Sequence, residues 1–142
     1  MKKSVIILIA VIYVAAIAVV SFFGLKPDSR VEKVYVDSVK ITNTEGIQYK
    51  ENGDKYVVIR PDENGELKYK IEYEVGPDNA TDKTVSFTYD TSVTYVSVDE
   101  ETGVVTFDMN AMTRNSGAII ITITSTDGLK VSDSIEIKAR KQ

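Results

Sequence analysis

The chain has 142 residues, a formal net charge of −4, and no Cys, His or Trp. This composition excludes disulfides, thiolate chemistry, imidazole acid–base catalysis and the commonest zinc sites. The length accommodates one domain and a short appendage.

The N-terminal region contains an uncharged apolar run of 21 residues from Val5 to Leu25, preceded by Lys2 and Lys3. As a helix, a run of this length spans about 30 Å, which is the thickness of a bilayer's hydrocarbon core. We therefore expect residues 1–25 to be a single transmembrane anchor that contacts the membrane through residues 5–25.

Two other interpretations of the apolar run are open. Ala16-Ile17-Ala18 has the small-x-small pattern of a signal-peptide cleavage site, although cleavage after Ala18 would leave an apolar mature N-terminus. The run is also longer than the usual apolar region of a signal peptide. A helix buried in a soluble protein is the third interpretation.

The orientation is predicted from chain length more than from charge. Basic residues flank the run on both sides, so the positive-inside count is close to a tie. The segment before the run is too short to form a domain, and long domains translocate largely regardless of charge. The expected localisation is therefore the cell membrane, with a single pass and an extracellular C-terminal domain.

The remainder of the chain is acidic. Two of the 17 basic residues precede the apolar run, which leaves 15 against 21 acidic residues, a formal charge of about −6. Nucleic acid is not an expected partner, because its binding requires a basic patch, and the domain is not expected to lie on an anionic membrane surface. The basic cluster Lys138, Arg140 and Lys141 is interpreted as a solvated chain end.

Residues 26–33 are polar, contain Pro27, and predict a linker; residues 34–142 predict an all-β domain. The hydrophobic period changes to two, turn signals recur about every ten residues, and no helical period follows Leu25. Seven or eight short strands indicate an immunoglobulin-like antiparallel β-sandwich. The expected strands cover residues 34–41, 56–59, 67–75, 85–89, 93–98, 104–107, 118–124 and 131–137.

The clearest alternation lies in residues 67–75, where apolar and charged side chains exchange at every position. The charged row of this strand should face solvent or a partner: Lys68, Lys70, Glu72 and Glu74. Its tyrosines are predicted to be core residues and not a binding stripe. Residues 118–124 (AIIITIT) are apolar at both odd and even positions, hence on both faces of a strand, and predict a central strand. The expected inward side chains are Leu67, Ile71, Tyr73, Phe87, Val98, Ile121 and Ile135.

Several motifs in the C-terminal half carry a family resemblance. Residues 77–85 (PDNATDKTV), 96–99 followed by 103–105, 116–128 and 134–137 occur in an order and spacing similar to those of the group 2 bacterial immunoglobulin-like domain, a module of intimin- and invasin-type surface proteins. The chain departs from that pattern in Phe87, where the family often has Trp, and in the longer stretches 41–67 and 108–116. The resemblance implies a spacer, adhesive or protein-contact module without catalytic residues.

Acidic turns are the only candidates for site chemistry. Residues 99–101, Asp62 and Glu63 with Glu66, and Asp78 with Asp82 could bind Ca²⁺ or supply paired carboxylates, but none has EF-hand spacing and nothing supplies a cleft. Solvated turns are the preferred interpretation. Asn79-Ala80-Thr81 matches a glycosylation sequon and is also explained by the turn. We expect no enzyme activity, no catalytic residue, no metal and no cofactor.

Three function classes follow. The preferred one is a membrane-anchored extracellular module that contacts other proteins and is adhesive or structural, with no small-molecule substrate. The alternative is an accessory single-pass subunit of a larger membrane complex. The third is a secreted soluble ligand-binding domain released by signal cleavage.

Overall fold

The computed structural model describes residues 3–23 and 31–142, and the chain divides into two compact units, residues 1–32 and 33–142. The predicted linker 26–33 and the predicted helix end at Leu25 fall largely or wholly outside the described residues. Each unit is described by itself.

The first unit contains the helix α1 (Lys3–Phe23). Residues Lys3–Phe22 have a mean hydropathy of 3.1 and none of this segment is buried in the structure, so it is long and apolar enough to cross a membrane. A signal sequence passes the same test. The helix thus has the length and composition predicted from the apolar run, and both interpretations of it stand.

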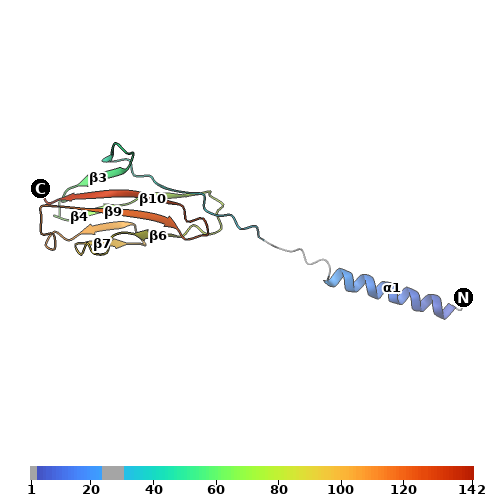
Figure 1. Ribbon diagram of the computed structural model, residues 1–142. Helices are drawn as coiled ribbons and strands as arrows, with labels where there is room; N and C mark the ends of the chain where they lie inside the picture. Colours follow the sequence, from blue (N-terminus) through green and yellow to red (C-terminus); the bar gives the residue numbers. More distant parts are fainter. Residues whose placement is uncertain (1–2, 24–30) are drawn as a thin grey trace. The chain divides into compact units, whose positions relative to one another are not determined.

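The second unit is built from β-strands arranged in a sandwich-like fold (Figure 1). A two-stranded sheet pairs β1 (Ser38–Ile41) with β5 (Tyr73–Gly76). A five-stranded sheet has the order β2 (Ile47–Tyr49), β3 (Lys55–Ile59), β10 (Ser132–Arg140), β9 (Ser116–Ser125), β6 (Val85–Thr88). A three-stranded sheet has the order β4 (Leu67–Lys70), β8 (Val104–Phe107), β7 (Val96–Asp99).

The core lies between the five-stranded and three-stranded sheets. Alternate residues of β9 and β10 are buried, including Ile121 and Ile137, and they join Leu67, Val105 and Phe107 from the facing sheet in one apolar cluster. This is the alternation expected of strands that bury one face. Of the seven predicted inward residues, Tyr73 and Val98 are half-buried and the other five are buried.

The segment predicted as one strand over residues 67–75 is two strands in different sheets. β4 pairs with β8, whereas β5 pairs with β1. The predicted facing of its side chains is confirmed, because Lys68, Lys70, Glu72 and Glu74 are exposed. Ile71 carries the chain from one sheet to the next, and its backbone N–H donates to the carbonyl of Gly103 (2.9 Å).

The first predicted strand, residues 34–41, is shorter than expected and begins at Ser38. Part of the preceding backbone is bonded to side chains, although the N–H of Asp37 still donates to the carbonyl of Gly76 in β5 (2.9 Å). The N–H of Val34 donates to Oγ1 of Thr81 (2.9 Å), and the N–H of Val36 donates to Oδ2 of Asp127. Strand β2, within the long stretch before residue 67, was not predicted.

Asp127 forms a buried polar cluster at the place where the chain enters the fold. Its side chain is 6% exposed, and its Oδ1 accepts from the hydroxyl of Ser125 (2.9 Å), which in turn accepts from the N–H of Val131 (3.1 Å). The bond from the Val36 backbone, together with that from Ser125, holds the pKa of the Asp127 carboxyl below its usual range and outweighs burial, which raises it. Asp127 thereby ties the entering chain to the end of β9.

We expect Asp127→Asn to lower the urea midpoint of unfolding at pH 7, because the amide replaces a charged acceptor. Since the folded-state pKa is depressed, the carboxylate stabilises the fold above its unfolded pKa of about 3.9, and this contribution is lost as pH falls through the folded pKa. The difference between wild type and variant should therefore shrink from pH 7 to pH 3. Asp78→Asn, at an exposed turn position, is the matched control. A difference that stays constant with pH would contradict this role.

Candidate protein-contact surface

The outward face of β9 carries an apolar side chain where a polar one is expected. Ile119, Ile121 and Ile123 are buried, whereas Ile120 between them is 56% exposed. The prediction of a central strand over residues 118–124 is confirmed, but not every apolar side chain of this run is buried. β9 lies between β10 and β6 in its sheet, but within residues 33–142 only one of its faces is covered.

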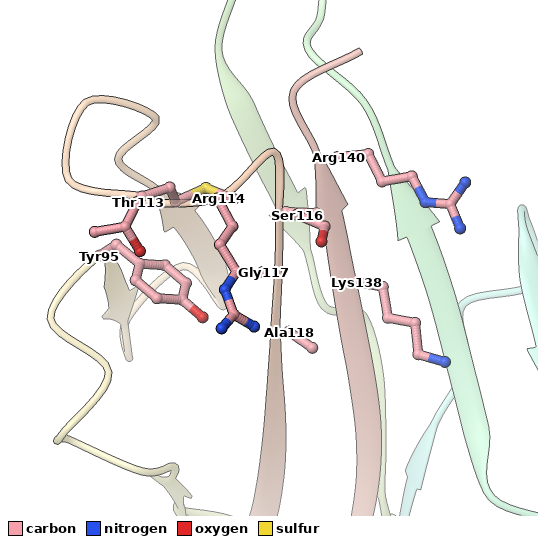
Figure 2. Close-up of a pocket in the computed structure, with 10 residues that line it drawn as sticks. Tyr95, Thr113, Arg114, Ser116, Gly117, Ala118, Lys138 and Arg140 are labelled. Atoms are coloured by element: carbon pink, nitrogen blue, oxygen red, sulfur yellow. The ribbon is translucent and has the colours of Figure 1, made fainter.

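Next to Ile120, the surface of the sheet is hollowed. A hollow of about 540 Å³, here called the basic hollow, is lined by Tyr95, residues 112–114, residues 116–118 and residues 138–140 (Figure 2). Residues 116–118 have small side chains (Ser, Gly, Ala), so few side-chain atoms project from the sheet there. A second hollow of about 330 Å³ is lined by Asp90, Val93, residues 118–120 and Glu136, and it shares Ala118 with the first.

Three cationic side chains surround the basic hollow. Figure 2 shows Arg114 on one side of residues 116–118, with Lys138 and Arg140 on the other. The guanidinium groups of Arg114 and Arg140 form no ion pair or hydrogen bond within the described part of the chain. Lys138 lies 4.4 Å from the centre of the Tyr56 ring and 3.8 Å from the Glu136 carboxylate. Two exposed arginines are thus available to a partner.

Glu136, which faces the second hollow, is neutralised by its neighbours. Nζ of Lys50 lies 2.7 Å from its carboxylate, and this hydrogen-bonded pairing raises the pKa of Lys50. With Glu136 paired to Lys50, the basic hollow keeps a net positive charge in an otherwise acidic chain.

The wall of the basic hollow depends on Gly117 and on the loop before β9. A Cβ at Gly117 would lie 2.8 Å from Cε2 of Tyr95 and 3.1 Å from Cε of Met112, so only glycine lets the ring approach the strand. The loop itself is fixed by Asp108, whose Oδ1 accepts from the N–H of Asn110 (2.8 Å), and by the Nζ of Lys141, which donates to the carbonyl of Met112 (2.8 Å). The hollow is therefore a built feature of the fold.

The basic residues near the C-terminus are not the solvated chain end that the sequence suggested. Lys138 and Arg140 lie in β10, where both are paired with β9, and Lys141 is bonded to Met112. The alternation Ile135, Ile137, Ala139 continues through this segment and is the signal that extends the strand to Arg140.

The carboxylates of the acidic turns accept hydrogen bonds from backbone groups of the same turns. Oδ1 of Asp62 accepts from the N–H of Asn64 and of Glu66, and Oδ1 of Asp99 accepts from the N–H of Glu101. Hydrogen bonds from the side chain and backbone of Thr84 lower the pKa of Asp82. Among residues 3–23 and 31–142, no group of three or more acidic side chains is placed to hold a metal ion.

The charged row predicted on residues 68–74 lies away from the basic hollow. Lys68 and Lys70 belong to β4 in the three-stranded sheet, and Lys68 is paired with Glu66 (2.6 Å). The structure does not bring this row together with Ile120 or the unpaired arginines.

Comparison with protein-family models and with curated proteins found no match to this chain.

The burial pattern of β9 predicts different losses of stability when two adjacent isoleucines are truncated. We expect Ile121→Ala to lower the free energy of unfolding by about 3–4 kcal/mol, because Ile121 is fully buried and the change leaves a cavity. Ile120→Ala should lower it by less than about 1 kcal/mol, because that side chain lies in solvent. Urea unfolding of the full chain in mild detergent, followed by circular dichroism, measures both. Equal losses would mean that the register of β9 is wrong by one residue.

Proposed function

We propose that this chain is a membrane-anchored surface protein in which α1 is the anchor and residues 33–142 form an extracellular, immunoglobulin-like module that contacts other proteins. The observation that carries this proposal is the exposed Ile120 on the outward face of β9, in a strand whose N-terminal end adjoins the unpaired Arg114 and Arg140. The contact surface comprises Arg114, Ser116, Ala118, Ile120, Lys138 and Arg140.

The immunoglobulin-like assignment is supported by strand order. In the constant-type immunoglobulin fold, the strands B, E and D are neighbours in one sheet and C, F and G in the other. The orders β4-β8-β7 and β6-β9-β10 have the same chain order and the same neighbours. The resemblance of residues 77–137 to the group 2 bacterial domain points to the same fold, and such modules serve in adhesion and as spacers.

The composition of the surface supports protein contact. Interface centres are depleted in charge and enriched in aromatic and arginine residues, and the residues that dominate binding energy are often Tyr and Arg. Ile120 and Ala118 supply apolar area, while Arg114, Arg140 and Tyr95 border it. This surface lies at the start of β9, whereas the chain enters the fold at its end, near Asp127.

An accessory subunit of a larger membrane complex is the second candidate. It is favoured by one observation on α1, a shallow apolar hollow of about 470 Å³ lined by Ala10, Ala15 and Ala18 among larger side chains. Small residues allow close packing of transmembrane helices.

Photo-crosslinking tests the contact surface directly. A photoreactive amino acid at position 120 of the intact chain, in its own membrane, should capture a protein, and the same group at exposed Ser97 on the facing sheet should not. A further variant at Ala15 reports on helix packing, so capture there and not at 120 would select the accessory subunit. The captured chain should retain residues 1–18 by mass spectrometry. A chain beginning at Val19 would contradict the anchor.

A further inference from the structure

In the described part of the chain, half of one edge of β9 has no strand beside it. β10 pairs with Ser116–Thr124 along one edge of β9, but β6 pairs with only four residues on the other, from Thr122 to Ser125. On the edge of β9 that pairs with β6, residues 116–121 therefore have no partner strand. Within the described residues, no backbone hydrogen bond outside the ladders engages them.

The edge is free because the chain turns away directly after β6. The N–H of Val93 donates to the carbonyl of Asp90 (3.2 Å), and the N–H of Ser92 donates to Oδ1 of Asp90 (3.0 Å), which forms a tight turn. The basic hollow and the second hollow lie along β9 at residues 116–120. The hollows provide open space at the residues that carry the unpaired edge.

The charge near this edge selects the kind of chain that would pair with it. Arg114 precedes β9 and lies beside residues 116–118, as Figure 2 shows, and its guanidinium has no partner among the described residues. Lys138 and Arg140 add positive charge across the strand. Arginine binds carboxylates through two parallel hydrogen bonds, so acidic side chains complement this site.

We propose that residues Ser116–Ile121 accept an extended, acidic segment of a partner protein as an added β-strand, with Arg114 pairing to one of its carboxylates. This inference rests on the proposed contact function and names its chemistry. Main-chain hydrogen bonds to the free edge supply affinity, as in other cases of strand addition, and side-chain contacts supply specificity. Ile120 and the arginines provide those contacts: an apolar side chain of the incoming strand packs on Ile120.

Hydrogen–deuterium exchange of the full chain in detergent micelles tests the proposal with a defined probe. The probe is an eight-residue peptide of alternating Glu and Val in excess. Exchange of residues 116–121 should slow at least about tenfold, while β7 should be unaffected. Arg114→Gln should reduce this protection at least about fivefold. Lys70→Gln, which removes an exposed cation from β4, should leave it unchanged.

Two control ligands separate strand addition from simple anion binding. A peptide of the same sequence with N-methylated amides keeps the charges and loses the backbone donors, so it should not protect residues 116–121; polyphosphate should not protect them either. Equal protection by either ligand would overturn strand addition in favour of an anion-binding hollow, and absence of protection by the probe would also overturn it. Protection that rises with protein concentration without peptide would identify a second copy as the occupant and overturn the proposal. None of these exchange results bears on photo-crosslinking at position 120, which tests the proposed contact function separately.

Discussion

The register of β9 against β10 is the constraint on which the rest of the structure depends. Nine residue pairs, from Ser116 with Arg140 to Thr124 with Ser132, fix it. In this register the buried rows of the two strands lie on the same side of the sheet and face Leu67 and Phe107. A shift by one residue would exchange the two faces of β9. The same pairing that builds the core therefore also places Ile120 on the surface.

The two ends of β9 have different chemistry. At its C-terminal end, Asp127 and Ser125 fix the entering chain through buried hydrogen bonds. At its N-terminal end, small residues, unpaired arginines and a free strand edge leave room for another molecule. Ten residues of extended chain separate the two ends by about 30 Å. The proposed contact surface and the point where the chain enters the domain therefore lie at opposite ends of the same strand.

The sequence predicted what depends on local pattern and missed what depends on distant pairing. Alternation predicted the facing of Leu67 and of the charged residues beside it, because facing is a property of the strand itself. It did not predict that this segment divides between two sheets, since the partners β8 and β1 are distant in sequence. The isoleucine run of β9 is apolar at both odd and even positions, so its pattern does not show that Ile120 is exposed, although Ile121 was correctly expected to point inward. The exposure of Ile120 follows because no element of residues 33–142 covers that face. The unpaired edge follows from the shortness of β6 and its turn at Asp90, which is a tertiary property.

The most direct measurement of the central claim is the reactivity of single cysteines in intact cells, because the chain has no cysteine of its own. Ile120→Cys and Ser97→Cys would be labelled with a membrane-impermeant maleimide before and after mild solubilisation. We expect Cys at 97 to react rapidly in both states, and Cys at 120 to react slowly in cells and rapidly once partners are removed. Equal and rapid reaction of both in intact cells would contradict a contact surface on the outward face of β9, and no reaction of either until the cells are opened would contradict an extracellular module.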